Sequence, residues 1–379
     1  MKICFLSTMA GIPWGGSEEL WTDAALLARR LGHDVMASVY DWPTRPARLG
    51  ELADTGVTIH FRPLQASRFQ RLVLRRDAHV DGLSDLAKRP YDLLCISQGG
   101  TFDLPHATPI EVIDKLTRGH TVPYGVVCQF GTDEEVLSPA AIERARDFFG
   151  RAGFIGFVSE HNRAAAVRHI AQDLPRALVL RNPVNLKDKS PVPWPSGGKT
   201  VICNVARLDA RVKGQDALIQ ALGTNTWRSR DWELQICGQG ADLDYLKMLA
   251  EQRQISDRVR FMGQVSDIRQ LWSQAHLLVM PSRAEGTPLA MVEAMLCGRP
   301  AVVTDVGGNA EWIREGETGF VAPSPAPQYI SAALDRAWAA RDQWQAMGAR
   351  AHAFAAERTK ENPAKVLLDL LLKEAPQLR

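Results

Sequence analysis

Short apolar runs alternate with helix-length stretches along most of this chain, and that alternation limits the folds it can adopt. In the first half the runs stand at residues 2–7, 35–40, 93–96, 124–128 and 154–158. Apolar runs of this length, without a polar face, are typical of strands buried between two layers of helices. The alternation therefore predicts a parallel sheet that is covered by helices on both faces.

The alternation starts a second time after a stretch of different composition. Between Asn182 and Gly198 the chain holds four prolines and two glycines without sustained periodicity, which is typical of a linker. A chain of 379 residues also exceeds what one hydrophobic core usually serves. We therefore expect domains at 1–184 and 198–357, joined by a linker at 185–197. Strands of the second domain are expected at 200–206, 233–237, 259–262, 277–280 and 301–304.

The two ends of the chain are both expected to belong to the first domain. After the first strand, a glycine-bearing loop leads to a helix from Ser17 to about Arg30, and Ser17 is a suitable N-cap. The amphipathic stretch at about 358–373 is expected to pack back on the first domain. Two successive α/β domains place a crevice at the carboxyl ends of their strands, which is the favoured ligand site in such sheets.

Charge and cysteine content exclude several classes of protein. A net charge of +2 argues against a nucleic-acid binder. The six cysteines include no C-x-x-C pair, and most sit in or beside apolar runs, as reduced buried thiols do. We therefore expect a cytoplasmic protein. We expect neither a signal peptide nor a membrane span, since no run approaches the roughly 20 apolar residues that a span needs.

Residues 280–308 carry the strongest functional signal. A strand is followed by a polar loop and then by a helix, for which Thr287 is a suitable N-cap and Pro288 a suitable first residue. Backbone amides at a helix start favour negative charge. Glu285 and Glu293 can accept hydrogen bonds from sugar hydroxyls at two ends of one ligand. Each glutamate alone is interpreted equally well as an ordinary loop or helix-surface acid, but together they suit a phosphorylated polyol.

This segment resembles the signature of glycosyltransferase family 4, a retaining group with the two-domain GT-B fold. The signature has two glutamates separated by seven residues, then Ala-Met, a glycine and a proline, here Glu285, Glu293, Ala294, Met295, Gly298 and Pro300. The resemblance implies two Rossmann-like, doubly wound parallel-sheet domains that face a central cleft. It also implies that Glu285 contacts the donor sugar and Glu293 the nucleotide ribose. The backbone next to the sugar and phosphates would be that of Gly286, Thr287, Pro288 and Leu289.

Other segments match the same family in the same order. Arg207 and Lys213 resemble the pair that neutralises the donor diphosphate, whose charge grows as the glycosidic bond breaks. Gly15 and Gly16 resemble the glycine pair that lets the backbone approach the donor phosphates or the acceptor. The remaining matches on the donor side are Gly238, Gly263 and Val265. Taken alone, the two cations could be surface charges and the glycine pair a tight turn.

The chain departs from the family pattern on the acceptor side. Many relatives carry a histidine at the end of a first-domain strand, where this chain has Gln129. A glutamine cannot act as a general base, although it can hydrogen-bond a sugar hydroxyl. We name Gln98 and Gln129 as acceptor-side candidates, and Arg207, Lys213 and Glu285 as catalytic candidates. In a front-face retaining transfer, the leaving phosphate oxygen can itself accept the proton of the acceptor.

The resemblance implies a retaining glycosyltransferase that moves a hexose-type sugar from a UDP- or GDP-sugar to a hydroxyl group. The acceptor would be a sugar, a lipid-linked molecule or a small molecule, in polysaccharide, glycolipid or glycoconjugate biosynthesis. The nucleotide sugar is a co-substrate, and we expect no cofactor and no obligatory metal. The alternatives are a nucleotide-sugar epimerase, a sugar phosphorylase of the same fold, and a nucleotide-sugar-binding protein without turnover.

A basic stretch of the first domain suggests a further partner. It contains no acid but five arginines, which are Arg62, Arg68, Arg71, Arg75 and Arg76. Such a stretch could contact an anionic membrane surface peripherally, or guide a phosphorylated acceptor. The alternative is an ordinary solvated basic segment.

Overall fold

A computed structural model describes residues 1–64, 82–108, 110–119 and 121–375 of the chain, and they form two compact units. The first unit contains the described residues from Met1 to Pro183 together with those from Glu361 onward, and the second contains Val184–Lys360. The stretch expected as a linker belongs to the second unit. Its apolar residues Leu186 and Val192 are buried in that unit's core, so the proline-rich segment packs there instead of standing free.

The sheet of the first unit is parallel throughout. Its seven strands among the described residues have the order β3-β2-β1-β4-β5-β6-β7. The strands are β1 (Lys2–Ser7), β2 (Asp34–Tyr40), β3 (Thr58–Arg62), β4 (Leu93–Gly100), β5 (Tyr124–Phe130), β6 (Phe154–Phe157) and β7 (Ala177–Val179). The helices are α1 (Gly16–Arg30), α2 (Ala47–Asp54), α4 (Leu83–Leu86), α5 (Asp103–Ala107), α6 (Ile110–Leu116), α7 (Pro139–Arg151), α8 (Glu160–Ile170) and α17 (Pro363–Lys373).

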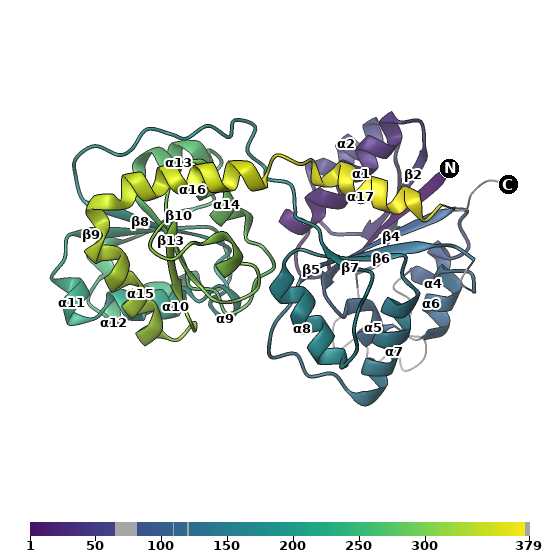
Figure 1. Ribbon diagram of the computed structural model, residues 1–379, viewed down its shortest axis with the longest axis horizontal. Coiled ribbons are helices and arrows are strands. Elements are labelled where there is room, and N and C mark those ends of the chain that lie inside the picture. The colour runs from purple at the N-terminus through teal and green to yellow at the C-terminus, as the bar shows by residue number, and fades with distance from the viewer. Residues whose placement is uncertain (65–81, 109, 120, 376–379) are drawn as a thin grey trace. The chain divides into compact units, whose positions relative to one another are not determined.

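Both faces of this sheet are buried because successive strand residues point to opposite sides. On β1, Ile3 and Phe5 join the core that contains residues of α1, α2 and α17. Cys4 and Leu6 join the core on the other face, with residues of α4 to α8. Helix α17, yellow in Figure 1, runs beside α1 although almost the whole chain separates them. The expectation of a parallel sheet covered on both faces is therefore confirmed.

The second unit repeats the same plan with six described strands, in the order β10-β9-β8-β11-β12-β13. The strands are β8 (Thr200–Val205), β9 (Trp232–Cys237), β10 (Val259–Gly263), β11 (Leu277–Met280), β12 (Ala301–Thr304) and β13 (Gly319–Ala322). The helices are α9 (Ala210–Lys213), α10 (Gln215–Leu222), α11 (Asn225–Arg228), α12 (Leu243–Gln252), α13 (Ile268–Gln274), α14 (Leu289–Leu296), α15 (Pro327–Ala339) and α16 (Trp344–Arg358). Short 3-10 helices occur at Ser256–Arg258, Ala310–Trp312 and Arg341–Gln343.

Both sheets reverse their strand order at the same place. Starting from the first strand of each unit, the chain adds strands to one side and then returns to add the fourth strand to the other. The reversal falls between β1 and β4 in the first unit and between β8 and β11 in the second. Ligands of open α/β sheets bind where the strand order reverses, outside the carboxyl ends of the strands. The loops that follow these four strands are therefore where a site is expected.

The two helix starts singled out in the sequence lie at other residues than expected. The N-cap of α1 is Gly15, not Ser17, and no side chain caps it. Helix α14 begins at Leu289 with Pro288 as its N-cap, so Thr287 lies one residue too early to cap it. Both backbones enter the helix from an extended conformation, at φ −150° for Gly15 and φ −72° for Pro288. Side-chain type alone did not reveal which residue makes that entry.

Candidate functional site

An ion pair in the second unit joins two segments that were singled out separately in the sequence. Lys213, the last residue of α9, places its Nζ 2.7 Å from Oε1 of Glu285. The hydroxyl of Ser282 donates to the same carboxylate oxygen over 2.7 Å. The side chains of Lys213 and Glu285 are only 20% and 5% exposed, so the cation balances a carboxylate that water barely reaches.

Backbone packing explains why this pair can form. Gly214 follows Lys213 with φ +67°, and a Cβ atom there would stand 2.0 Å from the carbonyl oxygen of Pro281. Glycine is therefore required both for the left-handed conformation and for the close approach. The amide of Arg283 donates to the carbonyl of Val212 over 2.8 Å. The loop after β8 and the loop after β11 thus lie backbone to backbone.

A third loop supports Glu285 from the other side. Gly307, after β12, has φ +52°, and a Cβ atom there would come within 2.2 Å of the Glu285 carbonyl oxygen. The amide of Gly308 donates to the carbonyl of Gly286 over 2.6 Å. Three loops therefore fix the backbone on which the Glu285 carboxylate is mounted.

Arg207 lies in the loop after β8 but makes a separate ion pair. Its guanidinium contacts Asp209 at 2.8 Å, and 42% of its side chain is exposed. A second arginine contact comes from the half-buried Arg283, whose two terminal nitrogens bind both carboxylate oxygens of Asp216 at 2.7 and 2.9 Å. A pair of this bidentate type fixes geometry better than a single contact does. Arg207 is thus accessible, whereas Arg283 holds the loops together.

Glu293 occupies the second turn of α14, four residues after Leu289 at the helix start. Residues four apart share a face of a helix, so Glu293 lies on the same face as Leu289. Burial raises the pKa of the half-buried Glu293 carboxyl above its ordinary value. Thr287 and Pro288, between the helix and Glu285, are themselves buried. The helix start and both glutamates thus belong to one continuous stretch of the second unit.

The three remaining donor-side candidates follow the outer strands of the same sheet. A Cβ atom on Gly238 would lie 1.9 Å from the carbonyl oxygen of Ala206, and its own amide donates to the carbonyl of Gly263 over 2.7 Å. Gly263 itself has φ +66°. Val265 is half-buried against the core of the second unit. Gly238 and Gly263 therefore join the loops after β8, β9 and β10.

In the first unit, the glycine pair forms the start of α1 without strain. Gly15 is the N-cap with an extended φ of −150°, and Gly16 is the first helical residue. Glu18 lies in the first turn of α1 and is buried. Burial raises the pKa of its carboxyl to about 7, while contacts with Ser7 and Trp21 and the charge of Arg62 partly offset that effect. A tight left-handed turn is thus not why glycine stands at Gly15.

Arg62 is a buried residue, which corrects its assignment to an exposed basic stretch. It is 0% exposed, donates to the carbonyl of Ser7 and stacks over the ring of Tyr40 at 4.1 Å. A guanidinium held in this way cannot contact a membrane surface. The other four arginines of that stretch lie outside the described residues.

The two acceptor-side glutamines are both buried at the carboxyl ends of their strands. The side-chain nitrogen of Gln98 donates to the Thr101 carbonyl over 2.9 Å, and its oxygen accepts from the Leu104 amide over 2.9 Å. Gln129 accepts from the side chain of Asn182 over 2.7 Å, and its own nitrogen has no hydrogen-bond partner among the described residues. Gln98 therefore shapes the turn into α5, and the roles of both toward an acceptor stay predictions.

The sequence reasoning missed a contact that mirrors the Lys213–Glu285 pair. Thr8, directly after β1, donates its hydroxyl to Asp103 at the start of α5 over 2.7 Å, and the amide of Gly100 donates to the same oxygen over 2.9 Å. Burial raises the pKa of Asp103 above its ordinary value. The signal available was positional, because Thr8 directly follows β1 and Asp103 lies three residues after β4, the two strands that flank the reversal of strand order.

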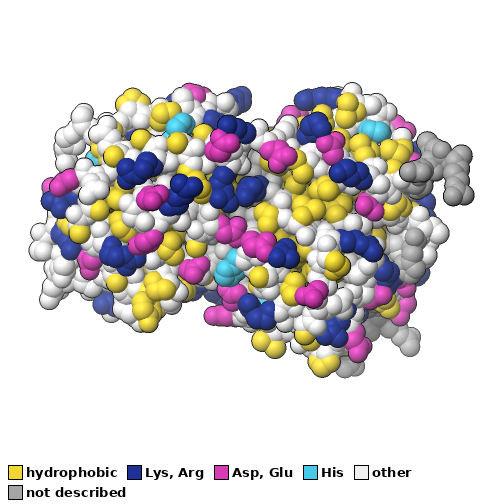
Figure 2. Space-filling model, in the orientation of Figure 1, with side chains coloured by type: hydrophobic (Ala, Val, Ile, Leu, Met, Phe, Trp, Pro, Cys, Tyr) yellow, Lys and Arg dark blue, Asp and Glu magenta, His cyan; other side chains and the backbone are white. Residues whose placement is uncertain are grey.

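Charge over the molecule is mixed. Figure 2 shows basic and acidic side chains interspersed over the visible face of each unit. Within the described part of the chain, no group of three or more His, Cys, Asp or Glu side chains is arranged to hold a metal ion. Nor is any helix of that part long and apolar enough to cross a bilayer.

Comparison with known proteins gives one family. A model described as "Glycosyl transferases group 1" matches residues 187–354. An alpha-D-kanosaminyltransferase of Streptomyces kanamyceticus is 33% identical over 275 residues, which cover 69% of this chain and 67% of that protein. An exopolysaccharide phosphotransferase of Streptomyces coelicolor is 25% identical over 401 residues, covering 100% of this chain and 40% of its own length. The chain spans only 40% of the length of this phosphotransferase, and 42% and 31% of the lengths of two other curated relatives.

Solved structures share the fold along nearly the whole chain. The HepE protein of Anabaena, crystallised with UDP, has a TM-score of 0.72 at 19% identity, covering 98% of this chain and 99% of that one. At that identity the likeness shows the fold. It agrees with the two Rossmann-like units described above, with their common strand order.

Proposed function

The chain belongs to the group 1 glycosyl transferases, of the family 4 type, and from that premise we propose that it transfers a sugar from a nucleotide-sugar donor to a hydroxyl acceptor. The observation that carries the proposal is the Lys213–Glu285 ion pair, held over 2.7 Å by glycines that allow three loops to meet. Such a pair presents a fixed cation and a fixed carboxylate next to the start of a helix. Phosphates and sugar hydroxyls bind to these two kinds of group.

In the proposed reaction, the bond between the anomeric carbon and the donor phosphate oxygen breaks while a bond to the acceptor oxygen forms on the same face. The phosphate oxygen takes the acceptor's proton, so no separate base is needed. Negative charge grows on the departing nucleoside diphosphate, and the Lys213 ammonium would stabilise it more in the transition state than in the ground state. Lys213 would then be shared between Glu285 and the phosphate, and Glu285 would keep a hydrogen bond to the sugar.

The other donor-side residues have positioning roles in this proposal. The half-buried Glu293 would accept hydrogen bonds from the ribose, and the exposed Arg207 would reach the diphosphate from the edge of the site. Backbone from Gly286 to Leu289 would lie against the sugar and phosphates. Gly238, Gly263 and Val265 would flank the nucleobase, and Gly15 and Gly16 would approach the donor or the acceptor. No step of this scheme uses a metal ion, so a chelator should leave turnover unchanged.

The test separates this proposal from its alternatives. A thermal-shift screen with UDP-, GDP- and ADP-sugars identifies the donor, because specific binding stabilises the folded state. Incubating that donor with acceptor hydroxyls should then give free nucleotide and glycosylated product. An altered sugar that stays on its nucleotide would indicate an epimerase. Sugar released as a phosphate would indicate a phosphorylase, and binding without any product would indicate a non-catalytic protein.

The compartment of the protein and its contact with a membrane are also proposals. We place the protein in the cytoplasm because all six cysteines are buried and free, which suits a reducing compartment. Contact of Arg68, Arg71, Arg75 and Arg76 with an anionic membrane predicts sedimentation with phosphatidylserine vesicles. Replacing Arg71, Arg75 and Arg76 by glutamate should abolish it, and wild-type protein that ignores such vesicles would rule this contact out.

A further inference from the structure

A cavity of about 290 Å³ lies in the first unit where β4 and β5 end, between α5 and α8. It thus borders the reversal of strand order, although none of the family motifs falls on it. Polar side chains of the lining come from three segments. They include Asp103 and His106 of α5, Thr132 and Glu135 of the loop after β5, and Asn162 and His169 of α8. Small-molecule sites usually have volumes of about 300–1,000 Å³, so this one suits a single sugar ring.

The lining combines hydrogen-bonding groups with an apolar wall. Phe102 and Phe130 both line the cavity, and the Phe102 ring packs edge-on against His169 with 6.0 Å between centroids. Carboxylates, hydroxyls and an amide surround the rest. A pyranose has hydroxyl groups at its edge and C–H groups on its faces, so it matches a polar pocket with an aromatic wall.

The charge of the lining is acidic. Asp103 and Glu135 are its carboxylates, and the described lining residues include neither lysine nor arginine. Arginines stand behind the lining: Arg144 donates to the carbonyls of Pro105 and His106 over 2.8 and 3.5 Å, and Arg168, beside His169, pairs with Asp133 at 2.7 Å. Like charges repel most strongly where water is scarce, so the cavity favours neutral or cationic ligands over phosphates.

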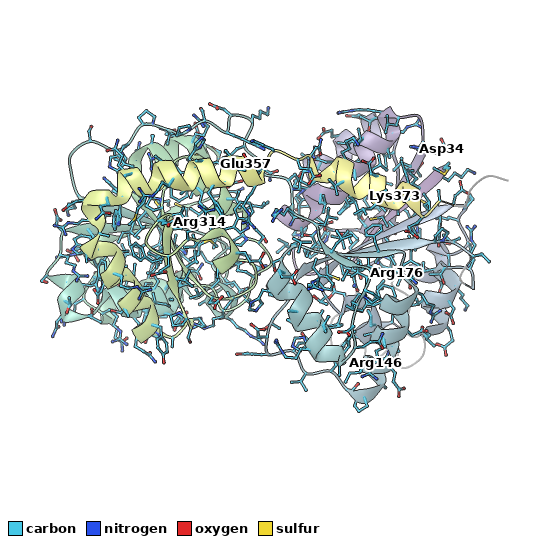
Figure 3. The ribbon with its side chains drawn as sticks, viewed as in Figure 1. Asp34, Arg146, Arg176, Arg314, Glu357 and Lys373 are labelled. Atoms are coloured by element: carbon cyan, nitrogen blue, oxygen red, sulfur yellow. The ribbon has the colours of Figure 1, made fainter. Side chains whose placement is uncertain are left out.

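The walls of the cavity are fixed before any ligand binds. Asp103 is held by Thr8 and by the Gly100 amide. Arg146 of α7, labelled in Figure 3, donates to the carbonyls of Ile170 and Ala171 at the end of α8 over 2.7 and 3.2 Å. A preorganised site loses little conformational entropy on binding, which favours a specific ligand.

We propose that this cavity binds the acceptor, that the acceptor is an uncharged or amine-bearing polyol, and that Asp103 and Glu135 exclude phosphorylated acceptors. The inference rests on the proposed glycosyl transfer and narrows it to one acceptor class. Within that class, the acidic lining favours an ammonium group over a hydroxyl. Both carboxylates would repel a phosphate. Glu135 is half-buried in the loop after β5, and Asp103 is the first residue of α5.

The test measures ligand binding to the full chain without any turnover. D-glucosamine, D-glucose and D-glucose 6-phosphate serve as probes in saturation-transfer NMR titrations up to tens of millimolar. We expect glucosamine to bind more tightly than glucose, and glucose 6-phosphate to bind at least about ten times more weakly than glucosamine, because a tenfold ratio needs only one well-placed charge. Equal or tighter binding of the phosphate, or no binding of either other probe, would overturn the proposal.

Variants locate the binding. Glu135→Gln should weaken glucosamine binding several-fold and leave glucose binding nearly unchanged. Glu134→Gln removes an exposed carboxylate from the adjacent position, outside the lining, and should change neither. Thr132→Trp should fill the cavity and abolish binding of both sugars while the melting temperature stays near that of the wild type. Sugar binding that survives Thr132→Trp would place the ligand elsewhere and contradict the proposal.

Donor binding, measured on the same samples by thermal shift, distinguishes a wrong assignment of the cavity from a wrong proposed function. If a nucleotide sugar stabilises the protein but the polyols do not bind, the assignment of the cavity fails and the proposed function stands. If the polyols bind but no nucleotide sugar does, the proposed function fails.

Discussion

The two units share one strand order but carry different chemistry at the same topological position. In the second unit, the segment after the first strand contributes Lys213 at the end of α9, and the loop after the fourth strand contributes Glu285, 2.7 Å away. In the first unit, the equivalent segments contribute Thr8 after the first strand and Asp103 at the start of α5, also 2.7 Å apart. One contact is an ion pair and the other is a hydrogen bond from a neutral hydroxyl. The common scaffold thus fixes where a site forms, and single residues decide what it binds.

The comparison also explains why one side of the proposed reaction is easier to recognise than the other. The proposed UDP- and GDP-sugar donors all carry a diphosphate, so a cation and a helix start are expected in a fixed order along the second unit. Acceptors have no common group. The acceptor residues proposed in the first unit, such as Asp103 and Asn162, therefore follow no general rule of type and spacing. If the two units divide donor and acceptor chemistry in this way, substitutions in each unit should have distinct effects.

The largest effect is expected at Lys213, on which the contrast between the units depends most. Lys213→Ala should lower turnover by about 10²–10³-fold, as loss of one preorganised charge in a site does, with a smaller effect on donor affinity. Steady-state kinetics with saturating donor measures this. Arg211→Ala removes an exposed cation from the same short helix and serves as the matched control. Unchanged turnover in the Lys213 variant would remove it from the catalytic residues.

A second large effect is expected on stability at the meeting of the loops. Gly214→Ala combines a left-handed φ with a clash against the Pro281 carbonyl, so the free energy of unfolding should fall by about 2–4 kcal/mol. Gly316→Ala is the control, because Gly316 has φ +73° but open space around its Cβ position. It should cost about 1 kcal/mol, as strain alone does. Equal losses in urea denaturation would show that the close approach of the loops is unimportant.

The next effect tests the buried acid of the first unit. Glu18 has a folded-state pKa of about 7 against an ordinary 4.5, so its contribution to stability is full below pH 4.5 and is lost as the pH rises through 7. Relative to Glu18→Gln, the wild type should therefore lose roughly 2–3 kcal/mol of unfolding free energy between pH 4 and pH 8. Parallel stability curves for the two proteins would contradict the burial of an ionisable carboxyl there.

The smallest effect is expected at Glu293. Glu293→Gln should weaken donor binding by about tenfold at pH 8, since hydrogen bonds to a charged group contribute about 1.5–3 kcal/mol and the amide retains part of that. Burial raises the pKa of Glu293, so the wild-type carboxyl gains its proton at a higher pH than an ordinary glutamate. The difference should shrink as the pH falls. Titration calorimetry measures it, with the exposed Glu251→Gln of α12 as control.

Most strands of the two sheets were predictable from the sequence, because buried parallel strands appear as apolar runs. Three strands were not recognised. β3 (Thr58–Arg62, TIHFR) alternates polar and apolar residues, whereas β7 and β13 are only three and four residues long. The donor-side candidates could be named from the sequence because Lys213, Glu285 and Glu293 fall in motifs. Asp103 was not, since its partner Thr8 is 95 positions away and no local pattern links them.

The return of α17 to the first unit has a consequence for how the protein is made. Leu367, Leu368 and Leu371 complete the core that Phe5 and Trp21 begin. A ribosome must therefore synthesise the chain as far as α17 before that early core is closed, and the second unit emerges entirely within the interval. Nascent chains halted before residue 363 would expose the apolar side of α1, so chaperone binding to them should persist until α17 leaves the exit tunnel.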